Sequence, residues 1–211
     1  MGKNYSRNNT TGKRKVSDFY ETPYCLIKEF IETDKKNWDF SKSFLDGSSG
    51  RGALEKVLKD YFHNIEAYDI SDGKDFLKEE RKFAYSIQNP PYGISLPFIL
   101  KAKEIITDRF AFLLPLTYLQ GKERLETVWK DKEYPLASVY VFNRYPMLGE
   151  ELRDDWKIHT GMQTYCWMVW DKHYTGEPII RWLDIDGYII RGKDEIKAEV
   201  AFVQDVEEET V

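Results

Sequence analysis

Short apolar runs alternate with amphipathic stretches along most of the chain. The apolar runs are rich in β-branched and aromatic residues, which favour strands, and the stretches between them repeat apolar residues at helical spacing. This alternation is typical of an α/β sheet in which strands and helices take turns. The pattern predicts strands over residues 43–46, 65–70, 83–88, 110–115, 137–142 and 164–170, and helices over about 24–33, 52–62, 94–106 and 121–131.

These elements predict a mixed, mostly parallel sheet with helices on both faces. Residues 137–142 and 164–170 are expected to close the sheet as an antiparallel pair at one edge. Two further strands, 179–184 and 188–191, flank an Asp-Gly turn that favours a hairpin. The expected organisation is a disordered basic arm over residues 1–17, an α/β domain over 18–172, and a small β-rich extension with an acidic tail over 173–211.

Length and composition limit the classes of protein to consider. At 211 residues with 42% hydrophobic content, the chain can form one full α/β domain. No apolar run is long enough to span a membrane and the N-terminus lacks a secretory signal, so we expect a cytoplasmic protein. Cys25 and Cys166 are far apart, which suggests neither a disulfide framework nor a metal site. A net charge of −5 argues against nucleic-acid contact over the whole surface.

A glycine-rich turn follows the first predicted strand. Asp46 ends that strand, and the turn contains Gly47, Ser48, Gly50 and Gly52 before a helix opens. Such a turn lets a ligand approach the backbone closely, although tight turns also use glycine for steric reasons alone. No Gly-Lys-Ser/Thr sequence follows, so the ligand implied contains adenosine but need not carry phosphates.

Carboxylates further along the chain favour a nucleoside ligand. Asp69 ends the next predicted strand, about twenty residues on, where a carboxylate accepts hydrogen bonds from ribose hydroxyls. Asp75 follows a turn and offers an acceptor for an adenine amino group, with Phe76 beside it as an aromatic wall. Each Asp alone could cap a turn, which is its commoner role. The ordered set of Asp46, the glycines, Asp69 and Asp75 favours ligand binding.

The third predicted strand delivers the sequence Asn89-Pro90-Pro91-Tyr92 to the edge where ligands bind in open α/β sheets. Two prolines fix the backbone and remove two donors, so the turn presents acceptors. The Asn89 side-chain oxygen and the Pro90 carbonyl could each accept one hydrogen of an –NH₂ group and make its nitrogen a better nucleophile. Tyr92 could stack on a planar substrate. The alternative is a Pro-rich turn capped by an aromatic residue.

Together these motifs resemble class I S-adenosylmethionine-dependent methyltransferases that methylate amino groups, most like phage and bacterial adenine-specific (N6) DNA methyltransferases. The similarity covers residues 18–170, and residues 19–23 match the family's aromatic-x-Thr-Pro element. It implies a Rossmann-like methyltransferase fold, S-adenosyl-L-methionine as cofactor and double-stranded DNA as substrate. The resemblance further implies that the catalytic residues of this chain are Asn89, Pro90, Pro91 and Tyr92. It implies that the cofactor-binding residues are Tyr20, Thr22, Pro23, Asp46, Gly47, Ser48, Gly50, Asp69, Ile70, Asp75, Phe76 and Asn89.

The chain departs from the family at two positions, and the second widens the range of possible substrates. Ser48 stands where the family often has Gly, and Asn89 where the sequence-specific DNA enzymes often have Asp. Asn at this position also occurs in enzymes that methylate RNA bases or a protein glutamine amide, so these substrates remain alternatives. A non-catalytic cofactor-binding subunit of a larger assembly is another, against which the intact Asn-Pro-Pro-Tyr turn speaks.

Few residues are left to form a separate target-recognition domain, because only about forty follow the predicted methyltransferase domain. We therefore expect target contacts from loops, from the tail, or from a second copy or partner subunit. Two segments, 120–134 and 143–163, interleave basic and aromatic residues, which suits a base-flipping surface. Tyr145 is predicted to form a wall of the substrate pocket. The alternative is an ordinary solvated surface, since acidic residues offset the basic ones.

Overall fold

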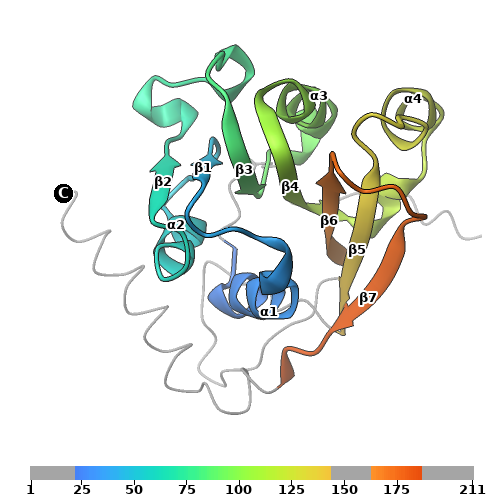
Figure 1. Ribbon diagram of the computed structural model, residues 1–211, viewed down its shortest axis with the longest axis horizontal. Coiled ribbons are helices and arrows are strands. Elements are labelled where there is room, and N and C mark those ends of the chain that lie inside the picture. The colour runs from blue at the N-terminus through green and yellow to red at the C-terminus, as the bar shows by residue number, and fades with distance from the viewer. Residues whose placement is uncertain (1–21, 144–162, 187–211) are drawn as a thin grey trace, which may run out of the picture.

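A seven-stranded sheet runs through the centre of the computed structural model, which describes residues 22–143 and 163–186 (Figure 1). The strands are β1 (Ser43–Asp46), β2 (Asn64–Ala67), β3 (Phe83–Gln88), β4 (Ile106–Pro115), β5 (Leu136–Phe142), β6 (Tyr165–Asp171) and β7 (Ile179–Leu183). They lie in the order β2-β1-β3-β4-β6-β5-β7. The helices are α1 (Tyr24–Asp34), α2 (Ala53–Leu58), α3 (Ser95–Ile105) and α4 (Lys122–Arg124), which continues as a π-helical turn, Leu125–Trp129.

Most strand pairs in the sheet are parallel. Only β6, among the described strands, runs the other way, antiparallel to both β4 and β5. The predicted antiparallel pair and the mixed, mostly parallel sheet are therefore confirmed. Residues 179–183, expected in a C-terminal extension, form β7 and pair in parallel with β5 as part of the same sheet. The expected hairpin partner, 188–191, lies outside the described residues.

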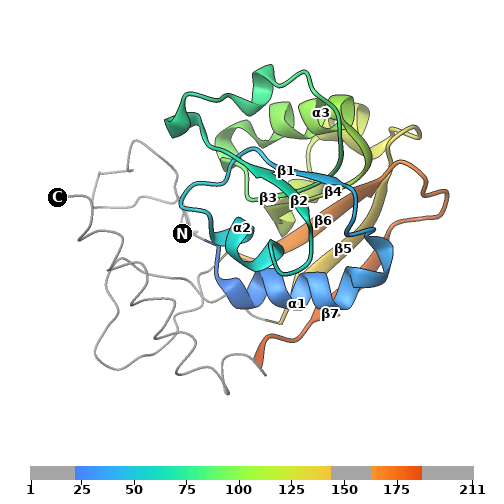
Figure 2. The same ribbon diagram turned by 60° about the vertical axis from the view of Figure 1, so that its left-hand side comes forward.

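Helices cover both faces of the sheet. Figure 2 shows α1 and α2 on one side and α3 on the other, and Figure 1 shows α4 on the side of α3. Because successive strand residues point to opposite faces, each central strand contributes side chains to two hydrophobic cores. In β4, Ala111 and Leu113 pack with α1, whereas Phe110 and Phe112 pack with α3. No helix in the described part of the chain has the length and apolar character needed to cross a membrane.

The strand β4 begins at Ile106, four residues earlier than its apolar content predicts. The additional residues at the start of the strand are mostly polar and include Arg109, which is only 5% exposed. Its guanidinium donates to Asp34 at 2.7 Å and to Asp171 at 2.6 Å. These ion pairs satisfy the buried charge, so Arg109 can occupy a central strand. The predictions for α2 and β2 were also wrong at their C-terminal ends, because α2 ends at Leu58 rather than near residue 62 and β2 ends at Ala67 rather than at residue 70.

Asp34 is the centre of this buried polar network. It is 0% exposed and lies at the end of α1. Besides Arg109, it accepts hydrogen bonds from the Tyr140 hydroxyl at 2.5 Å and from the Trp38 indole at 2.8 Å. The network thus joins α1 to β4, β5 and the segment that leads to β1. Because every partner in it is buried or partly buried, losing one leaves the others without compensation.

We expect Arg109→Met to destabilise the fold strongly. The substitution leaves Asp34 buried without its cation, which costs about 3–5 kcal/mol of unfolding free energy. Urea denaturation followed by circular dichroism measures this loss. As a control, Lys130→Met removes an exposed ion pair with Glu126 and should change the free energy by no more than about 1 kcal/mol. Similar losses in the two variants would contradict the assigned role of the network.

Candidate functional site

The predicted site residues in the described part of the chain gather at one edge of the sheet. β1 pairs in parallel with β2 on one side and with β3 on the other, so the carboxyl ends of the three strands meet there. The glycine turn 47–52 follows β1, an acidic loop spanning 69–78 follows β2, and the Asn-Pro-Pro-Tyr turn follows β3. Ligands bind at this edge in open α/β sheets.

Asp46 is the most perturbed carboxylate of the site. Its side chain is fully buried, and its Oδ1 accepts one hydrogen bond, from the Ser48 N–H at 3.2 Å. Its Oδ2 is buried and accepts no hydrogen bond from any residue that the structure describes. Burial, with smaller contributions from the nearby carboxylates of Glu55 and Asp69, raises the pKa of Asp46 to about 8. A buried carboxyl oxygen without a donor is suited to a ligand that brings a hydrogen-bond donor or a positive charge.

The glycine turn is held close to the sheet by an aromatic ring beneath it. A Cβ atom added to Gly47 would lie 2.3 Å from Cδ2 of Phe76, so no larger residue fits without a shift. Phe76 is 2% exposed and stacks on Phe98 with ring centroids 4.8 Å apart. The ring therefore supports the turn from the core instead of forming an exposed wall. Gly50 has φ 52°, a conformation that favours glycine.

The acidic loop contacts the glycine turn through Asp69. Its Oδ2 accepts a hydrogen bond from the Gly50 N–H at 3.3 Å, while its Oδ1 accepts from Ser71. Ile70, next in sequence, is 66% exposed. Asp75 caps a short 3₁₀ helix by accepting a backbone N–H. Asp69 and Asp75 therefore both serve as capping residues at this edge.

The turn after β3 contains an amide, Asn89, that contacts a buried threonine. The Asn89 Nδ2 donates to the Thr22 hydroxyl at 3.0 Å, and Thr22 is 2% exposed. With Nδ2 turned toward this hydroxyl, the acceptor Oδ1 lies on the other side of the amide. Pro90 is buried and Pro23 precedes α1. Tyr20 of the predicted aromatic-x-Thr-Pro element lies outside the described residues.

A second tyrosine faces the turn. The rings of Tyr92 and Tyr165 lie 5.5 Å apart and are tilted by 33°. Tyr165 begins β6 and stands opposite Pro115, the last residue of β4, so it belongs to the same edge of the sheet. The sequence analysis nominated Tyr145 instead, and that residue lies outside the described residues. Only the register of the antiparallel pair reveals Tyr165, and the sequence does not specify that register.

A buried hydrogen-bond chain links the glycine turn to β3, and the sequence analysis did not find it. The Ser48 hydroxyl donates to Gln88 Oε1 at 3.0 Å, and Gln88 Nε2 donates to the Ser86 hydroxyl at 2.8 Å. Gln88 and Ser86 are both 0% exposed. Since Gln88 immediately precedes Asn89, the chain fixes the two turns relative to each other. The hydroxyl of Ser48 makes this link, which a glycine at that position would lack.

The arrangement combines polar acceptors with apolar and aromatic surface. The buried carboxylate of Asp46 and the close backbone of the glycine turn suit a compact, positively charged group. Carboxylates and the exposed Ile70 lie next to it, and the acceptors of the Asn-Pro-Pro-Tyr turn suit an amino group. Within residues 22–143 and 163–186, no cluster of His, Cys, Asp and Glu is arranged to hold a metal ion.

Asp46→Asn is expected to alter the pH dependence of stability. The folded protein holds the Asp46 proton more tightly than the unfolded chain, in which Asp titrates near pH 4. This contribution to stability is complete below about pH 4 and is lost as the pH rises through about 8. Thermal unfolding of the unliganded protein at pH 5, 6.5 and 8 should show wild type losing stability relative to Asp46→Asn. A constant difference across these values would contradict the raised pKa.

No protein-family model matches this sequence, and no curated protein matches it. Solved structures do resemble the fold. A predicted RNA methyltransferase from Pyrococcus horikoshii superposes with a TM-score of 0.54 and 17% identity, over 76% of this chain and 91% of the other. Magnesium protoporphyrin IX methyltransferase from Synechocystis, solved with bound S-adenosylmethionine, gives a TM-score of 0.51 and 10% identity, over 71% and 79%.

A further similar structure is the M protein of the type I restriction enzyme EcoKI. It has a TM-score of 0.53 and 14% identity, and the match covers 77% of this chain but only 45% of the M protein. These likenesses, together with the order and directions of the strands, establish the fold predicted from the sequence. The chain has the Rossmann-like fold of the methyltransferases.

Proposed function

We propose that this protein transfers a methyl group from S-adenosyl-L-methionine to the exocyclic N6 amine of adenine in DNA. The observation that carries the proposal is the placement of Asn89-Pro90-Pro91-Tyr92. The turn follows β3, which pairs directly with β1, so it lies beside the glycine turn. A hydrogen bond joins the Asn89 amide to the Thr22 hydroxyl. A methyl donor in the glycine turn and an amino group at the Asn-Pro-Pro-Tyr turn are thereby neighbours.

The residues of the glycine turn fit this cofactor. The buried, unsatisfied Oδ2 of Asp46 offers an acceptor for the ammonium of its methionine part. Gly47 and Gly50 let the backbone approach the cofactor. Thr22 and Pro23 keep the cofactor-binding role that the sequence predicts for them. Asp69 would accept from the ribose hydroxyls, and the exposed Ile70 and Asp75 would contact the adenine. When bound, the cofactor supplies a methyl group activated by a positively charged sulfur.

The Asn-Pro-Pro-Tyr turn prepares the amine that receives the methyl group. Asn89 Oδ1 and the Pro90 carbonyl each accept one hydrogen of the target –NH₂, which withdraws the nitrogen lone pair from conjugation with the ring. The nitrogen then forms a bond to the methyl carbon while the carbon–sulfur bond breaks and its electron pair stays on sulfur. The nitrogen, now positively charged, releases a proton to solvent. No strong base is needed before attack, so the chemistry depends on positioning.

Several features support adenine in DNA as the target. Tyr92 and Tyr165 form an aromatic surface beside the turn, and stacking on aromatic rings holds a base taken out of its helix. The EcoKI M protein, which shares the fold, belongs to a restriction enzyme. A methylated RNA base is the main alternative, since the Pyrococcus protein with this fold is described as an RNA methyltransferase. A protein glutamine amide and a non-catalytic subunit are further alternatives.

The test is methyl transfer from radiolabelled S-adenosylmethionine to unmethylated double-stranded DNA, with nucleoside analysis of the product. We expect N6-methyladenine. Total RNA and a glutamine-containing translation factor, assayed in parallel, test the alternatives. Label in RNA or protein but not in DNA would overturn the choice of substrate. Binding of S-adenosylhomocysteine without transfer to any of them would favour the non-catalytic subunit, and absence of binding would overturn the proposed cofactor.

Asn89→Ala and Asp69→Ala should separate catalysis from cofactor binding. Loss of the Asn89 acceptor removes an interaction made with the reacting amine, so kcat should fall about 100-fold or more while the Kd for S-adenosylhomocysteine stays nearly unchanged. Asp69→Ala should instead raise that Kd first, because in the proposed complex the carboxylate accepts hydrogen bonds from the ribose hydroxyls. Calorimetry and the transfer assay measure the two effects. Equal turnover in wild type and Asn89→Ala would exclude the proposed role of the amide.

A further inference from the structure

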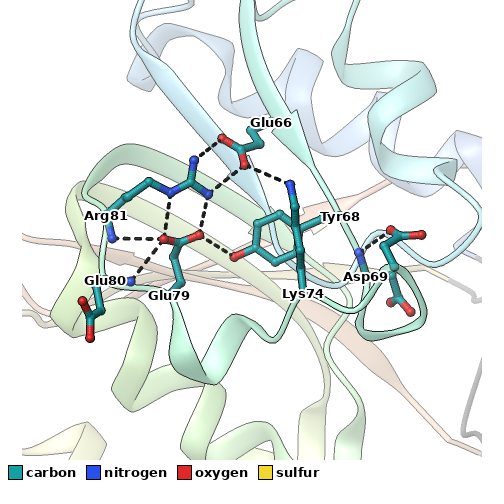
Figure 3. Close-up of polar contacts among 8 residues, drawn as sticks. Glu66, Tyr68, Asp69, Lys74, Glu79, Glu80 and Arg81 are labelled. Carbon is teal, nitrogen blue, oxygen red and sulfur yellow. Dashed lines mark hydrogen bonds and ion pairs between the residues drawn. The ribbon is translucent and has the colours of Figure 1, made fainter.

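Four side chains join the two ends of the acidic loop, and we call them the loop clamp: Glu66, Tyr68, Glu79 and Arg81 (Figure 3). Arg81 donates from both terminal nitrogens to Glu66, at 2.8 and 2.7 Å. The Tyr68 hydroxyl donates to Glu79 at 2.9 Å. Arg81 Nε also donates to Glu79 at 2.9 Å, which connects the two contacts. The clamp is therefore one network and not a set of separate surface pairs.

The clamp closes the loop at its base. Glu66 lies in β2 and Tyr68 immediately follows it, whereas Glu79 and Arg81 lie just before β3. The segment between them, 69–78, contains both Asp69 and Asp75. Closing a loop at its base removes many of the conformations open to it. Phe76, packed in the core, fixes the same segment at a second point.

Glu79 is the best satisfied member of the clamp. Its side chain is 10% exposed, against 55% for Arg81. It accepts hydrogen bonds from the guanidinium of Arg81, from backbone N–H groups and from Tyr68, and these lower its pKa to about 2. Glu79 is thus charged over the whole neutral range. Lys74, within the loop, reinforces the network with its Nζ 3.7 Å from Glu66 and 5.2 Å from the centre of the Tyr68 ring.

The charged members of the clamp lie outside the cores that hold the fold together. β2 is the outer strand of the described sheet, and the acidic loop extends from its end. Glu66, Glu79 and Arg81 belong to neither hydrophobic core, whereas Tyr68 is 3% exposed and packs in the core that contains Phe76. Loss of the Arg81 ion pairs should consequently loosen the loop and leave the sheet and its helices in place.

We infer that Glu66, Glu79 and Arg81 are positioning residues that hold the acidic loop in the conformation that binds the adenosine half of the cofactor. The inference rests on the proposed function, because it assigns Asp69 and Asp75 to ribose and adenine. A loop that is ordered before binding loses little conformational entropy when the ligand arrives. A loose loop must be ordered at that moment, which weakens binding without changing the chemical step.

The test is Arg81→Met, measured by calorimetry with S-adenosylhomocysteine and by the transfer assay. We expect the Kd to rise about tenfold, equivalent to about 1.4 kcal/mol, with kcat at saturating cofactor within about twofold of wild type. Arg81→Lys should restore part of the affinity because it retains a charge toward both glutamates. Lys42→Met is the matched control: it removes a 2.6 Å ion pair with Asp108 at the opposite edge of the sheet and should leave the Kd unchanged.

The outcomes distinguish the inference from the proposed function. Wild type that does not bind S-adenosylhomocysteine would overturn the proposed function. Wild type that binds it no more tightly than a folded Arg81→Met would overturn the positioning role, as would a loss of kcat as large as the loss of affinity. If Arg81→Met does not fold, Glu66→Gln removes the charge with little change of shape. An unchanged Kd in that variant would equally overturn the inference.

Discussion

The parallel pairing of β1 with both β2 and β3 is the constraint on which the candidate site depends. Parallel strands end at the same edge of a sheet, so each turn that follows one of these strands is brought beside the others. Hydrogen bonds then connect the turns individually. Gly50 donates to Asp69 between the first two, and Ser48 donates to Gln88 between the first and third. Residues separated by dozens of positions in sequence thus become one site without any long connecting element.

Local chemistry made much of this architecture predictable. β1 and β3 have the predicted bounds because each ends in a sequence, Asp-Gly or Asn-Pro, that cannot continue a strand. The start of β4 was not predictable in this way. Arg109 can occupy a buried strand only because Asp34 and Asp171, far away in sequence, neutralise its charge. Such compensation is a property of the tertiary structure, and no window of neighbouring residues contains it.

The candidate site shows the same division between local and distant information. The sequence identified Asp46, Asp69 and Asn89 from the turns in which they lie. It did not reveal that Phe76 would be buried beneath Gly47, or that Tyr165 would face Tyr92. Both facts depend on which face of the sheet a segment packs against and on strand register. Residue type and turn position therefore predicted which residues the parallel strands bring together, whereas the position of each aromatic ring required the fold.

Two fully buried carboxylates show how the fold distributes its polar contacts. Asp34 accepts from Arg109, Tyr140 and Trp38, so its burial is offset by charge and hydrogen bonds. Asp46 accepts a single backbone N–H and retains one oxygen without a donor. Burying a polar atom without a partner is costly, and stability alone would not favour it. The under-satisfied carboxylate lies at the edge where β1, β2 and β3 end, whereas the satisfied one lies in the structural core. This asymmetry is what a site completed by a cationic ligand requires, and it is an argument for the proposed cofactor that does not depend on the Asn-Pro-Pro-Tyr turn.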